Sequence, residues 1–370
     1  MRLAILGSRG FPSTYGGYET LVRHLAPFLV SAGHDVTVYC RSPREESKAR
    51  RWVEDGVNCI ATHGLDSKSL STLTFGFTAT LDAAFRRFDA MLVLNIANGF
   101  WLPLLRASKT PVAVNTDGIE WERGKWNRLG QSIFKAGAWL TARTATELVC
   151  DSVAIGDIWS ANFGRSSIFI PYGAPILRDV GHSKLANYPL TEQGYLLVVA
   201  RLAPENNVEL TLDALDLLGG SAPPAIIVGS ANFAAPIEAR LKSMEDRGRL
   251  TWLGHVHDQL LLSQLWANCS VYVHGHSVGG TNPALLQALG AGAPTLALDT
   301  PFNREVLHSA DQCFSNNASD LAEKIRTVLT TPGIQSDMRT RGQNVIRNHY
   351  SWNDVCQRYT QLLKCLGTSR

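Results

Sequence analysis

Glycines are concentrated in one loop near the start of the sequence, GSRGFPSTYGGYE from Gly7 to Glu19. The loop follows a short apolar segment at 2–7 and leads into an amphipathic segment at 18–33. Glycine lets the backbone approach a ligand closely, and the free amides of a helix N-terminus favour a phosphate. The spacing is not Gly-x-Gly-x-x-Gly, so a dinucleotide-dependent dehydrogenase is the weakest interpretation, and ordinary turn glycines are the other alternative.

A second candidate site is the segment NTDGIEWERGKW, which runs from 115 to 126 directly after an expected strand. Carboxylates accept hydrogen bonds from sugar hydroxyls, and aromatic rings stack on the C–H faces of sugars. A helix N-cap at Asp117 followed by surface acids is the alternative. The residues of interest are Asp117, Glu120, Glu122, Trp121 and Trp126.

The segment ARLAPENN, 200–207, places Arg201 at the end of another expected strand. A guanidinium is always charged and can bind a pyrophosphate through two hydrogen bonds. A structural ion pair between Arg201 and Glu205 is the competing interpretation.

The longest motif is HGHSVGGTNPALLQALGAG, in which Pro283 occupies the position favoured in the first turn of a helix. Free amides, Thr281 and Asn282 would meet an anionic or hydroxyl-rich ligand there. His274 and His276 lie two residues apart on a strand without further ligands, so we expect no metal site.

These motifs need elements that hold them together at one edge of a sheet. Short apolar segments alternate with amphipathic segments of helix length, which is typical of parallel sheets. Strands are expected at 2–7, 34–40, 57–63, 88–95, 111–115, 147–152 and 166–171, and again at 195–200, 224–229, 249–254, 270–275 and 293–299. The sequence therefore predicts two doubly wound α/β domains, Rossmann-like and facing a central cleft, with ligands at the carboxyl ends of the strands.

Composition narrows the class of protein. The 370 residues are 45% hydrophobic and 18% charged, which excludes disorder, collagen-like repeats and a coiled coil. No apolar run reaches the roughly 20 residues of a transmembrane helix, and we expect no signal peptide. Seven cysteines without a Cys-x-x-Cys pair fit reduced thiols, so a cytoplasmic protein is expected.

Together the motifs resemble the GT-B-fold glycosyltransferases of family 4, and most closely the branch with a rhamnosyltransferase-type N-terminal domain. The resembling segments follow the family's order along nearly the whole chain. They are SRGFPSTYGGYET, NTDGIEWERGKW, CDSVAI, IPYGAP, ARLAPENN, HSVGGTNPALLQAL and FNREV. The resemblance implies an acceptor domain at 1–180, a nucleotide-sugar domain at 181–350 and a C-terminal helix at 351–370 that crosses back to the first domain.

The resemblance also assigns roles to individual residues. It makes Arg201 and Asp117 the catalytic residues, with Arg201 on the donor diphosphate and Asp117 on the transferred sugar. It implies retention of anomeric configuration, no cofactor and no metal. The residues expected to bind substrate are Gly16, Gly17, Glu19, Glu120, Asn206, Gly280, Thr281, Asn282 and Gln287.

Two departures from the family pattern bear on the donor. The family pairs two glutamates where this chain has Gly279 and Gln287, and it has a lysine where this chain has Asn206. A neutral amide holds a ribose diol less tightly than a carboxylate, and a deoxyribose needs that contact less. The expected donor is therefore a dTDP-sugar, first dTDP-L-rhamnose, and the expected acceptor is a glycan or polyprenyl-linked sugar in surface polysaccharide synthesis.

Three other functions stay open. They are a hexosyltransferase that uses a UDP- or GDP-sugar, a nucleotide-sugar epimerase and a catalytically degenerate subunit. An epimerase would need more acid and base side chains than the motifs supply.

Charge is uneven along the sequence. Residues 1–180 hold 20 Lys and Arg against 16 Asp and Glu, a net +4, while the remainder holds 15 against 16, a net −1. The excess is too small to predict nucleic-acid binding. Segment 121–143 interleaves five cations with aromatic residues, which suits an anionic membrane surface, although a packed helix with a solvated face is the alternative. The expected location is the cytoplasm, with peripheral contact to the inner face of the plasma membrane.

Overall fold

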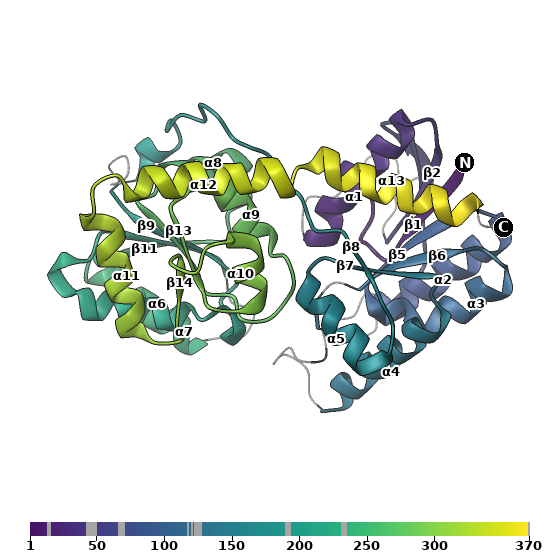
Figure 1. Ribbon diagram of the computed structural model, residues 1–370, viewed down its shortest axis with the longest axis horizontal. Coiled ribbons are helices and arrows are strands. Elements are labelled where there is room, and N and C mark those ends of the chain that lie inside the picture. Colours follow the sequence, from purple (N-terminus) through teal and green to yellow (C-terminus); the bar gives the residue numbers. More distant parts are fainter. Residues whose placement is uncertain are drawn as a thin grey trace. The chain divides into compact units, whose positions relative to one another are not determined.

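The computed structural model describes residues 1–12, 16–41, 50–65, 71–116, 118–119, 121, 128–188, 194–230 and 235–368. The chain forms two compact units (Figure 1). Unit 1 comprises Met1–Tyr172 and Trp352–Arg370, and unit 2 comprises Gly173–Ser351. The expected boundary at residue 180 thus lies inside unit 2.

Unit 1 is built on an eight-stranded sheet with the order β3-β4-β2-β1-β5-β6-β7-β8. Every pair of neighbours is parallel except β3 and β4. The central strand β5 is buried along its whole length, as expected for a sheet covered by helices on both faces. The strands are β1 (Arg2–Leu6), β2 (Asp35–Cys40), β3 (Arg51–Glu54), β4 (Val57–Ala61), β5 (Ala90–Leu94), β6 (Val112–Asn115), β7 (Glu147–Cys150) and β8 (Ile168–Phe169).

Helices cover both faces of this sheet (Figure 1). Because crossovers between parallel strands are right-handed, α1 lies on one face and α2 to α5 lie on the other. The C-terminal helix α13 packs on α1, β5 and β6, and so joins the face of α1. The helices are α1 (Gly17–Ser31), α2 (Ser71–Arg86), η1 (Ile96–Trp101), α3 (Leu102–Ala107), α4 (Arg128–Thr144), α5 (Val153–Phe163) and α13 (Trp352–Thr368).

Unit 2 is built on a six-stranded parallel sheet with the order β11-β10-β9-β12-β13-β14. Its strands are β9 (Leu196–Val199), β10 (Ala225–Val228), β11 (Leu250–Gly254), β12 (Val271–His274), β13 (Thr295–Leu298) and β14 (Cys313–Phe314). Its longer helices are α6 (Val208–Leu218), α7 (Ala235–Asp246), α8 (Gln259–Asn268), α9 (Pro283–Gly290), α10 (Pro301–Leu307), α11 (Ala318–Thr330) and α12 (Ile334–His349). Short 3-10 turns complete it: η3 (Leu185–Asn187), η4 (Pro204–Asn206) and η5 (Gly219–Ser221).

Two parallel-sheet α/β domains confirm the predicted fold class. Two strands were not expected from the sequence, β3 and β14. β3 is an exposed antiparallel edge strand whose Val53 is 60% exposed, so it lacks the apolar run of a buried strand. β14 has only two residues, too few to show a periodic pattern. No helix in the described part of the chain is long and apolar enough to cross a membrane.

Candidate active site

The glycine-rich loop of unit 1 leaves the carboxyl end of β1 and presses against the end of β5. Gly7 has a φ of 101°, and a Cβ there would overlap the carbonyl oxygen of Leu94. Only glycine therefore allows this close approach without moving the backbone. The loop ends where Gly17 begins α1.

Glu19 is buried beneath this loop with 7% of its surface exposed. Its Oε1 accepts a 2.9 Å hydrogen bond from the backbone N–H of Arg9. Gly16 has a φ of 117°, and a Cβ there would overlap Glu19 Oε2. Glu19 therefore ties the start of α1 to the backbone of the loop at Arg9, and its predicted contact with substrate stays a prediction.

The segment after β6 is described only in part, and Asp117 and Glu120 lie outside the described residues. Asn115 donates a 2.7 Å hydrogen bond from Nδ2 to the hydroxyl of Tyr359 on α13. Trp121 is buried, and its ring packs edge-on against Trp159 and Phe163 at centroid distances of 6.2 Å and 5.9 Å. Trp121 thus belongs to an aromatic cluster that also supports α5.

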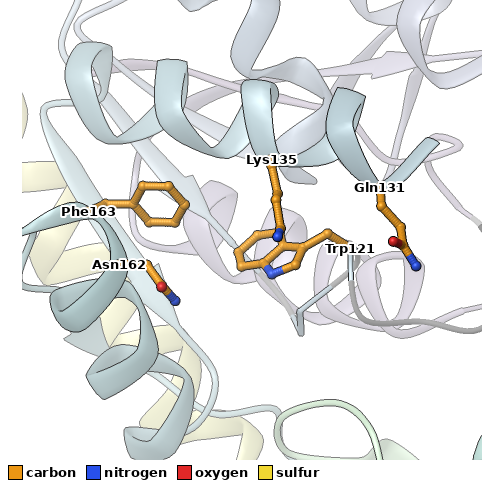
Figure 2. Close-up of a pocket in the computed structure, with 5 residues that line it drawn as sticks. All are labelled: Trp121, Gln131, Lys135, Asn162 and Phe163. Atoms are coloured by element: carbon orange, nitrogen blue, oxygen red, sulfur yellow. The ribbon is translucent and has the colours of Figure 1, made fainter. Parts of the chain in front are cut away.

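A pocket of about 500 Å³ opens beside Trp121. Figure 2 shows Gln131 and Lys135 projecting into it from α4, while Asn162 and Phe163 enter from the end of α5. Aromatic rings beside an amide and an ammonium group can contact both the apolar face and the hydroxyls of a sugar. The sequence did not reveal this pocket, because its two walls are about 30 residues apart and meet only by the packing of α4 and α5.

In unit 2, Arg201 lies at the carboxyl end of β9 and is exposed. Among the described residues its guanidinium makes no hydrogen bond or ion pair, so the structure does not form the alternative ion pair with Glu205. The backbone beneath it is held, because Asn206 is only 2% exposed and donates a 2.8 Å hydrogen bond from Nδ2 to the Arg201 carbonyl. Arg201 is thus a charged side chain on a fixed loop.

The loop after β9 is tied to the loop after β12, its neighbour in the sheet. The backbone N–H and the hydroxyl of Ser277 each donate a 2.9 Å hydrogen bond to the Glu205 carbonyl. Asn207 donates a 2.8 Å hydrogen bond from Nδ2 to the Gly275 carbonyl. Sheet topology and these bonds place the loops of the ARLAPENN and HGHSVGGTNPALLQALGAG motifs side by side at the carboxyl edge of the sheet. Ser277 and Asn207 were not singled out from the sequence.

The loop after β12 ends at the N-terminus of α9, with Pro283 in its first turn as predicted. Asn282 caps this helix by accepting a 2.9 Å hydrogen bond at Oδ1 from the N–H of Ala284. Thr281 is buried, whereas Gly280 and Gln287 are half-buried. Asn282 therefore uses one oxygen to cap the helix.

The histidine pair on this edge has a packing role. His274 is 1% exposed, and its Nδ1 lies 3.1 Å from the Tyr272 hydroxyl. The His274 ring stacks on His276 with ring centroids 4.2 Å apart. Burial, and to a lesser extent the charge of His276, lowers the pKa of His274 well below its usual range. Asn303 on α10 donates a 3.0 Å hydrogen bond to the His276 carbonyl and fixes the loop further. In the described part of the chain, no group of three or more His, Cys, Asp or Glu side chains could hold a metal ion.

Comparison with known families covers both units. Residues 15–173 match the family described as Glycosyltransferase Family 4, and residues 185–345 match the family described as Glycosyl transferases group 1. The chain is a glycosyltransferase of the GT-B, family-4-like type. Its predicted assignment to the rhamnosyltransferase-type branch stays a prediction.

Solved structures of GT-B glycosyltransferases share this fold at low sequence identity. Sucrose-phosphate synthase from Thermosynechococcus elongatus is 16% identical with a TM-score of 0.82, covering 100% of both chains. Anabaena HepE in complex with UDP is 17% identical with a TM-score of 0.77, covering 99% of this chain and 100% of the other. WaaG, a glycosyltransferase involved in lipopolysaccharide biosynthesis, is 15% identical with a TM-score of 0.72, covering 98% and 99%.

Proposed function

We propose that this glycosyltransferase moves L-rhamnose from dTDP-L-rhamnose to a glycan or lipid-linked acceptor in surface polysaccharide synthesis. The observation that carries a nucleotide-sugar donor is Arg201, whose guanidinium makes no ion pair with any described residue while its backbone is held by Asn206. An exposed cation on a held backbone, with no counter-ion among the described residues, is suited to a diphosphate. The part played by WaaG in lipopolysaccharide biosynthesis supports a surface glycan as the product.

The proposed reaction retains anomeric configuration by substitution on the front face of the sugar. The bond between C1 and the diphosphate oxygen breaks as the acceptor oxygen bonds to C1, and the acceptor proton passes to the departing phosphate. Arg201 and the amides at the start of α9 stabilise the charge that develops on the diphosphate. No Asp-x-Asp pair occurs in the sequence, so the proposal requires no metal. Asp117 is assigned to the transferred sugar.

The amide of Gln287 favours a donor whose nucleotide contains deoxyribose. Gln287 lies on α9, one turn after the Gly280–Asn282 loop, and is half-buried. An amide oxygen accepts weaker hydrogen bonds than a carboxylate, so the 2′-hydroxyl of a ribose contributes less here. A dTDP-sugar loses little by lacking that hydroxyl.

On the acceptor side, we assign a sugar of the acceptor to the pocket of Trp121, Lys135, Asn162 and Phe163. The pocket volume of about 500 Å³ holds a sugar ring, and its aromatic and polar groups match both kinds of sugar surface. This assignment uses unit 1 for the acceptor and unit 2 for the donor.

A second candidate is hexosyl transfer from a UDP-sugar, which HepE favours because its structures contain UDP and UDP-glucose. Incubation of the purified protein with dTDP-rhamnose, UDP-glucose or GDP-mannose and a lipid-linked sugar acceptor separates the candidates. A rhamnosylated product from the first donor supports the proposal. Faster turnover of a UDP- or GDP-sugar contradicts it, an isomerised donor indicates an epimerase, and binding without turnover indicates a degenerate subunit.

A further inference from the structure

Helix α2 exposes large apolar side chains and no polar ones. Its exposed residues are Phe77, Leu81 and Phe85, spaced four apart, with exposed fractions of 39%, 42% and 82%. Its charged residues Asp82 and Arg86 are half-buried and pair with each other. A surface helix of a globular protein ordinarily has the opposite arrangement, with polar residues outward.

The next two helices of the same layer also expose large apolar side chains. Helices α2, α3 and α4 are in contact one after another on one face of the sheet, and Arg106 donates a 3.0 Å hydrogen bond to the Arg143 carbonyl. Leu104 on α3 is 38% exposed, and three residues of α4 reach 40–69%. We call this surface the α2–α4 face and define it by Phe77, Leu81, Phe85, Leu104, Leu129, Ile133 and Trp139.

The α2–α4 face is unusual for its extent. Its seven residues are more than half of the thirteen exposed large hydrophobic side chains among the described residues. Soluble monomers rarely expose apolar side chains gathered on one surface, and such a patch usually marks an interaction site. Among the described residues of unit 2, this class contains Leu217 and Leu260 alone.

Positive charge surrounds this apolar surface. Arg87 follows α2, Lys109 follows α3, and α4 begins at Arg128 and ends beside Arg143, all four of them exposed. Helices α3 and α4 contain no Asp or Glu, and the acid of α2, Asp82, is neutralised by Arg86. The face therefore combines exposed apolar rings with cations that no carboxylate of its own helices neutralises.

We propose that the α2–α4 face binds the surface of an anionic lipid membrane. Phe and Leu side chains would enter the boundary between headgroups and acyl chains, and Trp139, with Arg143 stacked 4.7 Å from its ring, would lie at headgroup level. The cations would contact lipid phosphates. A second copy of this chain would place cations against cations, so charge favours lipid over self-association.

The structure extends the membrane segment that the sequence suggested at 121–143. Residues 122–127 lie outside the described part of the chain, whereas α2 and α3 add Phe77, Leu81, Phe85 and Leu104. The sequence did not single out α2, because apolar residues at helical spacing usually face the core. Only the structure shows that these side chains are exposed. Membrane binding needs neither donor nor acceptor, so its failure would leave the proposed transfer reaction untouched.

Sedimentation with vesicles of phosphatidylcholine, with and without phosphatidylglycerol, tests the proposal. The wild-type protein should bind the anionic vesicles and lose binding as salt is raised. The variant F77S/L81S/F85S should bind at least roughly 100-fold more weakly, since each buried large apolar side chain contributes strongly to transfer from water. The variant R87Q/K109Q/R128Q should bind about 100-fold more weakly, because each lost cation lowers vesicle affinity by about tenfold or less.

Matched variants in unit 2 provide the controls. L217S/L260S removes exposed apolar side chains of similar exposure, and K242Q/R326Q/R347Q removes three exposed cations. Both should bind vesicles as the wild type does, with all variants unfolding at similar temperatures. Equal binding of F77S/L81S/F85S and wild type would overturn the proposal. A dimer that forms without vesicles and is lost in F77S/L81S/F85S would instead show a protein interface.

Discussion

The buried side-chain amide of Asn206 donates a 2.8 Å hydrogen bond to the backbone carbonyl of Arg201. The family places a lysine at the position of Asn206, where a second cation would face the diphosphate. In this chain the residue instead fixes the backbone that carries the remaining cation. We therefore expect Asn206 to act on sugar transfer through Arg201, so that the two behave as one unit in mutant kinetics.

Replacement of Arg201 by alanine should lower sugar transfer by about 100-fold or more, the scale of losing one charge-stabilising donor in a transition state. The loss should appear in kcat as well as in donor affinity, because charge on the diphosphate grows as the C1–O bond breaks. Steady-state kinetics with Arg326→Ala as the control, an exposed arginine on α11, would check this. Near-normal turnover of Arg201→Ala would remove Arg201 from the active site.

Replacement of Asn206 by alanine should lower transfer by roughly fivefold, because loss of one buried hydrogen bond costs about 1 kcal/mol and loosens the loop. In an Arg201→Ala background the same change should have little further effect on transfer, since it acts through the missing guanidinium. A double-mutant cycle on kcat/KM measures this coupling. Additive losses would show that Asn206 contacts the donor independently.

Replacement of Gln287 by glutamate should shift donor preference from dTDP- toward UDP-sugars by about tenfold, because a charged acceptor strengthens a hydrogen bond from the 2′-hydroxyl by about 1–2 kcal/mol. Competition between dTDP- and UDP-linked forms of one sugar measures the shift. Gln357→Glu is the control, because Gln357 is exposed on α13, which packs on α1, β5 and β6 rather than on α9. An unchanged ratio would contradict the role assigned to Gln287.

Replacement of Gly16 by alanine should destabilise unit 1 by about 1–3 kcal/mol, because alanine is strained at a φ of 117° and its Cβ overlaps Glu19. Gly279→Ala is the matched control, since its φ is also far into the positive region at 136° but its Cβ would meet open space. Urea unfolding of both variants separates backbone strain from displacement of Glu19. Equal losses would mean that the contact with Glu19 contributes nothing.

His24 on α1 stacks on Trp352 at the start of α13, with centroids 4.1 Å apart and planes at 14°. Burial, assisted by Arg23, lowers the pKa of His24 from 6.5 to about 4. The unfolded state therefore binds more protons between about pH 4 and 6.5, so stability falls as pH drops through this window and is unaffected by His24 above it.

The variant His24→Phe keeps an aromatic ring against Trp352 but cannot titrate. Between pH 7 and pH 5 the wild type should lose about 2 kcal/mol more of its unfolding free energy than this variant. Urea unfolding at both pH values measures the difference, and His257→Phe in unit 2 controls for loss of a histidine. A pH dependence identical in wild type and His24→Phe would refute the assignment.

The sequence by itself determined the class of fold, because the alternation of apolar strands with amphipathic helices is a local pattern that each segment carries independently. It also located the loops that carry Gly16, Arg201 and Asn282, since each directly follows a recognisable strand. The position of Pro283 in the first turn of α9 was likewise predictable from local chemistry.

Tertiary structure alone decided how those residues are used. Glu19 and Asn206 are predicted to bind substrate, and the structure adds that one polar atom of each bonds to a backbone group 10 and 5 residues away, which no local pattern reports. The Trp121 pocket and the α2–α4 face arise where helices distant in sequence pack side by side. Spacing in the sequence shows which face of α2 is apolar, but only packing determines that Phe77, Leu81 and Phe85 point to solvent.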